Sequence, residues 1–235
     1  MHTGLYNRNR KGRNTGFVDP RVLLEDGLLD LELEELLDGD DDLLMEYVTE
    51  LMNWNRVYNL TSVRKPTDII TRHILDSLSI LPYLQGNRIL DVGTGAGLPG
   101  IPLAIACPER EFVLLDSSSK KLRFVQQTLG ILELDNVLLE NMRIEDYRPE
   151  SLFDTITCRA FSDLPDFYRH AARLCNADGR LLAMKGVYPM TEIECLEDRD
   201  VIDDVIALKV PGLDAERHLV SLLPGNAVAG GEQAG

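Results

Sequence analysis

The sequence predicts an α/β fold in which a mostly parallel sheet of seven strands is covered by helices, with a helical extension at the N-terminus. From residue 88 onward, short apolar runs alternate with longer amphipathic patterns, which is typical of a parallel sheet with helices on both faces. Before residue 88, apolar residues recur only at helical spacing. The 235 residues, 44% of them hydrophobic, suffice for one large domain with a buried core.

The segment before the sheet begins with a polar stretch and continues as three helices. Residues 1–18 lack a hydrophobic pattern, and we expect a disordered basic arm there. Asp19-Pro20 is a helix start, because aspartate caps a first turn and proline fits its first position. Further helices are expected from about residue 42 to 58 and from about residue 66 to 81.

The rest of the chain supplies the strands. They are expected at residues 88–90, 111–115, 136–139, 153–158, 180–185, 201–210 and 217–223. Asp178-Gly179 is interpreted as the turn that leads into the fifth of them. The chain is thereby divided into the basic arm (1–18), a helical extension (19–65), the sheet-containing domain (66–223) and a flexible tail (224–235).

Residues 91–100, Asp-Val-Gly-Thr-Gly-Ala-Gly-Leu-Pro-Gly, join the first strand to a helix, as in a nucleotide-cofactor site. The glycines are spaced G-x-G-x-G, and the third glycine of a dinucleotide fingerprint would fall at Leu98. Asp91 would repel a pyrophosphate but suits an ammonium or a sulfonium group. Asp116 ends the second strand, where a carboxylate accepts hydrogen bonds from ribose hydroxyls. These features favour S-adenosylmethionine over NAD or FAD; the alternative is a structural glycine turn in an unrelated α/β protein.

The net charge of −15 is unevenly distributed along the chain. Residues 22–50 hold twelve acidic residues and no base, whereas residues 1–21 hold five bases and one acid. A chain this acidic is not an obvious nucleic-acid binder. If it binds RNA, a local basic face must do so, and the acidic segment should point away. The basic arm could contact phosphates, although a solvated tail is the more ordinary role of such a segment.

The composition argues against several other classes of protein. The four cysteines form no C-x-x-C pair, and the four histidines show no metal-ligand spacing. No apolar run approaches the roughly 18 residues of a membrane span. The basic N-terminus is not followed by the apolar stretch of a secretory signal. We therefore expect a cytoplasmic protein that uses no metal ion and no membrane.

Polar or glycine residues mark the ends of four expected strands, namely Gly93, Asp116, Arg159 and Lys185. Ligands of open parallel sheets bind beyond the carboxyl ends of the strands, so we expect these residues to face one site. Arg72 and Asp76, four positions apart on the third helix, are interpreted as a pair on a solvated surface. The alternative places His73 and Asp76 along the mouth of the cofactor site.

Five short motifs occur along the chain in a fixed order. They are Asn59-Leu60-Thr61-Ser62-Val63-Arg64, Arg72-His73-Ile74-Leu75-Asp76-Ser77, the glycine turn 91–100, Cys158-Arg159-Ala160-Phe161 and Met184-Lys185-Gly186. In this order they resemble the ribosomal small subunit methyltransferase G family, also called glucose-inhibited division protein B. The likeness covers about residues 44–223. Ala96 stands where many members have proline, and Cys158 stands where serine is usual.

The resemblance implies a class I S-adenosylmethionine-dependent methyltransferase of Rossmann-like fold that methylates N7 of guanine 527 in 16S rRNA. Carried over by motif, Gly93 and Leu98 line the methionine and sulfonium, Asp116 holds the ribose, and Ile144 and Glu145 flank the adenine. The full set of expected cofactor-binding residues is Asp91, Gly93, Gly95, Leu98, Asp116, Ile144, Glu145 and Arg159, and the expected catalytic residues are Arg159 and Lys185. The expected partner is 16S rRNA or the small ribosomal subunit, and the chain is expected to be a monomer.

The chain lacks the motifs of other methylation chemistries. It has neither an Asn/Asp-Pro-Pro-Tyr motif, used on exocyclic amines, nor a Pro-Cys nucleophile, used on carbon 5 of pyrimidines. Guanine N7 has a free lone pair and no proton to lose, so in-line transfer to it needs placement rather than a general base. Arg159 and Lys185 could orient the guanine or nearby phosphates.

Two other functions remain open at this point. The acidic charge motivates a methyltransferase that acts on a small molecule or a protein. The cofactor pocket alone is also compatible with a non-catalytic S-adenosylmethionine-binding module.

Overall fold

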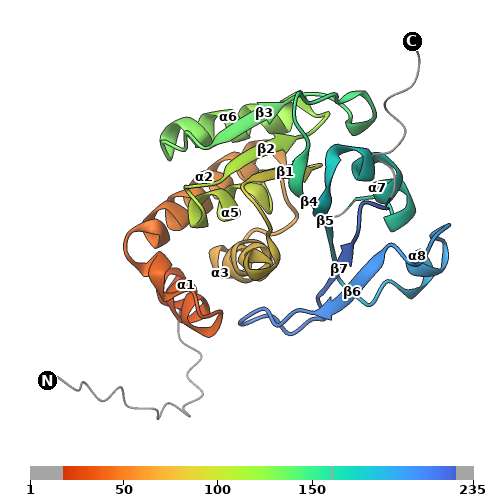
Figure 1. Cartoon of the computed structure of the whole chain (residues 1–235). Helices are drawn as coiled ribbons and strands as arrows, with labels where there is room; N and C mark the ends of the chain where they lie inside the picture. The colour runs from red at the N-terminus through yellow and green to blue at the C-terminus, as the bar shows by residue number, and fades with distance from the viewer. Residues whose placement is uncertain (1–17, 160, 226–235) are drawn as a thin grey trace, which may run out of the picture.

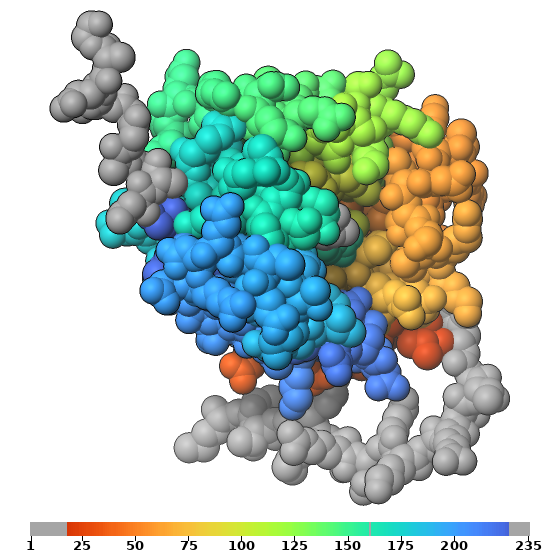
Figure 2. Space-filling view, turned by 90° about the vertical axis from the view of Figure 1, so that its right-hand side faces the viewer, coloured from red at the N-terminus to blue at the C-terminus, as the bar shows by residue number. Residues whose placement is uncertain are grey.

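The computed structural model describes residues 18–159 and 161–225, so the predicted basic arm and flexible tail lie almost wholly outside the described residues. A single sheet runs through the molecule, with helices on both of its faces (Figure 1). Helices α7 (Leu164–Ala171) and α8 (Met190–Glu194) lie on the right in Figure 1 and therefore on the face shown in Figure 2.

The sheet has seven strands in the order β3-β2-β1-β4-β5-β7-β6. Their bounds are β1 (Arg88–Val92), β2 (Glu111–Leu115), β3 (Val137–Glu140), β4 (Phe153–Arg159), β5 (Cys175–Lys185), β6 (Ile202–Ala207) and β7 (His218–Leu222). Strands β1 to β5 pair in parallel, and β7 runs antiparallel to both of its neighbours. The predicted α/β class and mostly parallel sheet are confirmed. The strand order reverses between β1 and β4, which is where open sheets of this kind bind ligands.

The central strands are buried on both faces, because successive residues point into two different cores. Ile89 and Phe112 belong to one core, whereas Leu90 and Val113 belong to the other. Helices α5 (Gly100–Ala106) and α6 (Ser119–Ile131) contribute to the first core, and α7 contributes to the second.

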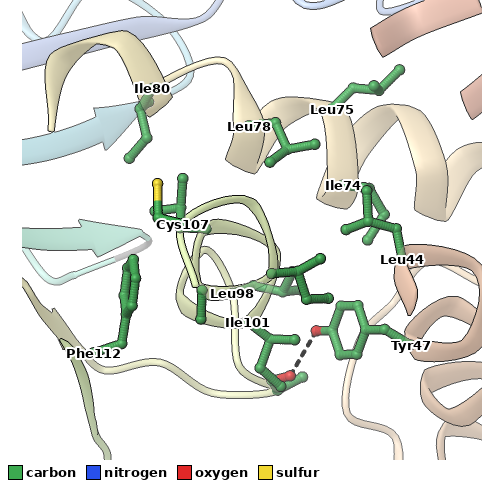
Figure 3. Packing of buried hydrophobic residues seen from close by; sticks show 14 of the residues in the cluster. Leu44, Tyr47, Ile74, Leu75, Leu78, Ile80, Leu98, Ile101, Cys107 and Phe112 are labelled. Carbon is green, nitrogen blue, oxygen red and sulfur yellow. Dashed lines mark hydrogen bonds between the residues drawn. The ribbon is translucent and has the colours of Figure 1, made fainter. Parts of the chain in front are cut away.

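The N-terminal helices pack into the first core together with the sheet. Helix α1 (Pro20–Asp30) begins after Asp19, whose side chain accepts a hydrogen bond from the Arg21 N–H, as predicted. Helix α2 (Asp40–Tyr58) follows a short 3₁₀ turn, η1 (Glu34–Leu37). Leu44 and Tyr47 of α2 face Leu98 and Ile101 next to the glycine turn (Figure 3). The extension is therefore continuous with the hydrophobic core of the sheet.

The third predicted helix is not one regular helix. It consists of α3 (Pro66–Ile69), a π-helical turn η2 (Ile70–Leu75) and α4 (Asp76–Leu78), and η3 (Leu81–Tyr83) follows. A π turn holds more residues than an α turn, so it changes which side chains share a face. The apolar residues of this segment, among them Ile69, Ile70, Ile74 and Leu78, nevertheless all belong to the first core.

The predicted turn at Asp178-Gly179 was also wrong, because both residues lie inside β5. The pairing of β4 with β5 contains a bulge, since Phe153 pairs with Cys175 and Thr155 with Arg180. A Cβ on Gly179 would lie 2.6 Å from the carbonyl oxygen of Asp154, so the two backbones approach too closely for any side chain. Glycine marks this close approach rather than a chain reversal.

In the part of the chain that the structure describes, no helix is both long and apolar enough to cross a membrane. Across residues 18–159 and 161–225, no group of three His, Cys, Asp or Glu side chains is placed to hold a metal ion. All four cysteines are free.

Candidate active site

The glycine turn between β1 and α5 folds back onto the end of β2. The N–H groups of Gly93 and Thr94 both donate to the carbonyl oxygen of Leu115, at 2.8 and 3.1 Å. Gly93 and Gly95 have φ of 69° and 61°, which is the left-handed region that glycine adopts at little cost. The N–H of Gly95 donates to Asp116 Oδ2 at 2.8 Å. The turn therefore brings the ends of β1 and β2 together around one carboxylate.

Helix α2 supports the same turn from behind. The hydroxyl of Tyr47, which is fully buried, donates to the carbonyl oxygen of Ala96 at 2.7 Å (Figure 3). Leu98, 4% exposed, packs into the core on this side of the turn. The shape of the turn thus depends on a residue from the N-terminal extension.

Asp91 lies at the end of β1, as predicted, and is completely buried. Its carboxylate accepts hydrogen bonds from the Gly100 N–H at 3.0 Å and from the Thr157 hydroxyl at 3.3 Å. Burial raises the pKa of Asp91 to about 6, against the opposing effect of these donors. In this structure Asp91 ties β1 to the start of α5, and its role in cofactor binding stays a prediction.

A first cavity, of about 200 Å³, lies beyond the carboxyl ends of β1 and β2. Four of the predicted cofactor-binding residues line it: Gly93, Asp116, Ile144 and Glu145. Its charged lining residues are Asp116, Glu145 and Asp166 against Arg143, so three carboxylates and one cation give a net charge of −2. We call it the acidic cavity.

Asp116 is the best-defined acceptor of the acidic cavity. Its two carboxylate oxygens accept the N–H groups of Gly95 and Ser118, each at 2.8 Å, and Lys121 Nζ lies 3.9 Å away. An ionised carboxylate offers about four acceptor positions, so Asp116 keeps capacity for two further donors. A Cβ on Gly93 would meet nothing within 4 Å, so the space above the turn is open. This wall therefore fits a ligand that has both a ribose with two hydroxyls and, elsewhere in the molecule, a cationic group.

A second cavity, of about 550 Å³, lies beyond the ends of β4 and β5. It contains both predicted catalytic residues, Arg159 and Lys185. Its charged lining residues are Arg72, Arg159, Lys185 and Arg217 against Asp76 and Glu192, so four cations and two carboxylates give a net charge of +2. We call it the basic cavity. Phe161 lines both cavities, which therefore adjoin.

The carboxylate of Asp76 holds two arginines of the basic cavity. It accepts from Arg217 Nε at 2.8 Å and from Arg159 Nη1 at 3.5 Å. Asp76 is only 3% exposed, so its interpretation as half of a solvated pair with Arg72 was wrong. Its actual partners come from β4 and from the residue before β7, which lie far away in the sequence. His73 and Asp76 do lie along a cavity wall, but it is the wall of the basic cavity and not of the acidic one.

His73 is neutral and fixed in one tautomer. Its Nδ1 lies 2.9 Å from the carbonyl oxygen of Arg72, to which it donates, and its Nε2 accepts from the Thr61 hydroxyl at 2.8 Å. Burial, together with the nearby Arg159 guanidinium, lowers the pKa of His73 to about 4. The imidazole thus adds no charge to the basic cavity at neutral pH.

Lys185 ends β5 and pairs with Glu192 of α8 at 2.7 Å. The lysine side chain is only 12% exposed, so this pair is held with little solvent around it. Glu192 also accepts the N–H of Leu164 at the start of α7. The ammonium group is therefore fixed at the edge of the basic cavity and remains a donor.

The structure groups most of the predicted site residues, but not all of them. Gly93, Asp116, Ile144 and Glu145 meet in the acidic cavity, and Arg159 and Lys185 meet in the basic one. Asp91, Gly95 and Leu98 lie in or behind the turn and line neither cavity. Sequence reasoning missed Arg217 and Glu192. No local sequence pattern marks Arg217: it reaches the cavity because it precedes β7, which pairs antiparallel with β5 so that His218 lies opposite Lys185.

The comparison with protein families decides the identity of this arrangement. Residues 40–220 match the family model GidB, described as rRNA small subunit methyltransferase G. The chain belongs to this family. It is therefore a methyltransferase that uses S-adenosylmethionine.

Individual relatives agree with the family model. The ribosomal RNA small subunit methyltransferase G of Nitrosococcus oceani is 51% identical over 205 residues, which cover 87% of this chain and 95% of the relative. The protein of the same name from Klebsiella pneumoniae is 48% identical over 197 residues, covering 84% and 95% of the two chains. This member of the family thus spans nearly the full length of its relatives.

Solved structures support the fold at lower identity. The ribosomal protein L11 methylase of Lactobacillus delbrueckii subsp. bulgaricus superposes with a TM-score of 0.51 at 17% identity, covering 63% of this chain and 76% of the other. The precorrin-6y C5,15-methyltransferase of Geobacter metallireducens gives a TM-score of 0.50 at 14% identity, covering 71% and 91%. At these identities the likeness concerns the fold alone, which is that of S-adenosylmethionine-dependent methyltransferases.

Proposed function

We propose that this protein transfers a methyl group from S-adenosylmethionine to N7 of guanine 527 in 16S rRNA. The observation that carries the proposal is the pair of adjoining cavities of opposite charge at the point where the strand order reverses. Family membership supports the ribosomal substrate, because the relatives are named for the small subunit rRNA.

The acidic cavity is the proposed cofactor site. When bound there, S-adenosylmethionine supplies a methyl group on a positively charged sulfur, which a wall of net charge −2 favours. Asp116 accepts the ribose hydroxyls with its remaining lone pairs, and Ile144 and Glu145 flank the adenine. Gly93 leaves the space above the turn free of side chains.

The basic cavity is the proposed site of the target guanine. Arg159 and Lys185 orient the guanine through its oxygen, or orient the adjoining phosphates, by charge-assisted hydrogen bonds. Neither is needed as a base, since N7 carries no proton. Their carboxylate partners, Asp76 and Glu192, fix both groups before the substrate arrives. These fixed side chains place the guanine and exclude water. Reactants oriented in this way react as if their concentrations were much higher.

The proposal is tested by mapping methylated guanines by mass spectrometry in 16S rRNA from cells with and without this protein. We expect one N7-methylguanine to disappear without the protein and to return with the wild-type chain, but not with Arg159→Ala. Purified protein should transfer label from the cofactor to naked 16S rRNA or to small subunits lacking the modification. Label that appeared only in protein or in small molecules would refute the proposal.

A further inference from the structure

A short apolar segment is exposed to solvent between β5 and α8. Val187, Tyr188 and Met190 are 71%, 45% and 55% exposed. Single exposed apolar residues are ordinary, but neighbouring ones that include an aromatic ring are typical of contact surfaces. We call these three residues the apolar rim.

The apolar rim adjoins the basic cavity. Lys185 and Gly186 precede it and Glu192 follows it, and all three line that cavity. The rim therefore lies at the mouth of the site where we place the target base. Figure 2 looks onto this face of the molecule, with the α8 region in blue toward the viewer.

Tyr188 is held in place and is not covered. Its ring stands at 84° to that of His218, with 5.5 Å between the centroids, so at least one face of the tyrosine is free of the histidine. His218 in turn has its Nδ1 3.1 Å from the carbonyl oxygen of Gly186. The ring is thus supported by a fixed neighbour, as a stacking platform requires.

We propose that the apolar rim stacks the nucleotide next to the target guanine, with Tyr188 as the platform. The inference rests on the proposed function and adds to it a contact outside the catalytic cavity. A base that enters the basic cavity must leave its stack, and its neighbour then loses a stacking partner. Tyr188 replaces that partner without regard to sequence, because every base has a π face.

The surroundings of the rim favour RNA over a protein as its occupant. The adjoining cavity has a net charge of +2 in a chain of net charge −15, so the cavity itself attracts the phosphates of a polyanion. An aromatic ring beside cations is the combination found in sites for single-stranded nucleic acid.

The test compares Tyr188→Ala with Tyr188→Phe, using as substrate small ribosomal subunits purified from cells that lack this protein. For the alanine variant we expect KM for the subunits to rise about 5- to 100-fold, since stacking on one aromatic ring contributes that much to binding. The phenylalanine variant keeps the ring and should behave as wild type. Affinity for S-adenosylmethionine and the salt dependence of KM should not change, because stacking involves no ion release.

Val57→Ala is the control for loss of an exposed apolar side chain elsewhere, because Val57 is 71% exposed, lies on α2 and lines neither cavity. Its KM should equal that of the wild type. Ultraviolet irradiation of wild-type protein bound to the subunits should attach a nucleotide to the peptide that contains Tyr188.

An unchanged KM for Tyr188→Ala, or a loss that follows the melting temperature, would overturn the inference while the wild-type protein still methylated the subunits. A Tyr188 cross-link to a ribosomal protein would overturn it too. Wild-type protein that methylated neither subunits nor naked rRNA would instead refute the proposed function itself.

Discussion

The two cavities share a sheet edge and one phenylalanine, yet they have opposite charge and are built differently. The walls of the acidic cavity come mainly from the ends of β1 and β2 and from the segment around Ile144. The basic cavity is built from side chains of distant segments, with Asp76 holding an arginine 141 positions away. In the proposed function, this difference separates the cationic methyl donor from the polyanionic acceptor within one site.

The acidic segment 22–50 contributes no residue to the basic cavity. None of the twelve acidic residues in the segment 22–50 lines either cavity. This placement agrees with the expectation that the acidic segment points away from a bound RNA. Net charge alone would have excluded a nucleic-acid substrate, whereas the local charge of +2 favours one.

Arg159→Ala should give the largest effect, and this effect should be on activity toward the RNA substrate and not on cofactor binding. We expect kcat/KM for the ribosomal substrate to fall roughly 10²-fold, because a misplaced target base costs about that much. Affinity for the cofactor should stay near wild type, since Arg159 does not line the acidic cavity.

The matched control is Arg180→Ala, which removes an arginine paired with Asp203 outside both cavities. Steady-state kinetics, calorimetry and thermal unfolding check the result together. Equal losses of activity in the two variants, or a loss explained by melting temperature, would make Arg159 structural.

Asp116→Ala should act on the acidic side. Each hydrogen bond to a charged acceptor contributes roughly 1.5–3 kcal/mol, so loss of one or two of them weakens cofactor binding about tenfold or more. Titration calorimetry with S-adenosylmethionine measures this directly. Unchanged affinity would remove the ribose role from Asp116, and an unchanged KM for RNA is the internal control.

Asp76→Asn should loosen the two arginines without removing them. Asparagine keeps the size and one acceptor oxygen but loses the charge that Arg159 and Arg217 face. We expect kcat/KM for RNA to fall about tenfold, with a loss of stability of roughly 1–3 kcal/mol, because both arginines retain some contact with solvent. A cofactor affinity that fell as far as the RNA kinetics would contradict the separation of the two cavities.

Tyr47→Phe should weaken cofactor binding, although Tyr47 does not line the acidic cavity. The change leaves the buried carbonyl of Ala96 without its donor, which costs about 1–2 kcal/mol of stability. We expect cofactor affinity to weaken severalfold and KM for RNA to stay unchanged. Thermal unfolding and calorimetry check both, and unaltered cofactor affinity would show that the turn keeps its shape without this bond.

The smallest effect should appear in the pH dependence of stability. The pKa of His73 falls to about 4 in the fold, so its contribution to stability is present above about pH 6.5 and is lost as the pH falls toward 4. The pKa of Asp91 rises to about 6, so Asp91 has the opposite effect, and stability rises as the pH falls from 6 toward 4.

These two effects oppose each other in the wild type, and His73→Gln should expose the second. Between pH 7 and pH 5, the free energy of unfolding of the variant should rise relative to that of the wild type. Denaturant unfolding at the two pH values measures the difference. A variant curve parallel to that of the wild type would place the pKa of His73 near its ordinary value.

The sequence predicted the acidic cavity better than the basic one for a physical reason. Gly93, Asp116 and the strand ends belong to local patterns, in which spacing along the chain fixes spacing in the fold. The pairing of Asp76 with Arg217 depends on the antiparallel placement of β7, which no local pattern encodes. The pairing of Arg72 with Asp76 was inferred from their spacing alone, whereas the carboxylate of Asp76 binds Arg159 and Arg217 from distant parts of the chain.

The same limit explains the error at Asp178-Gly179. A glycine after an aspartate is typical of a turn, but here the absence of a side chain on Gly179 lets the backbone of the neighbouring strand approach closely. Sequence periodicity found nearly every strand within a few residues, because central strands such as β1 and β2 are buried on both faces and therefore largely apolar.

The hydrogen bond from Tyr47 to Ala96 has a consequence for anyone who edits this enzyme. A minimal version that started at the first strand would lose the contacts from α2 that support the glycine turn. A chimera that exchanged the leading helices with those of another protein should keep a hydroxyl at the same point if the turn is to retain this bond. The N-terminal helices precede the sheet in the sequence, but in the fold they support the glycine turn.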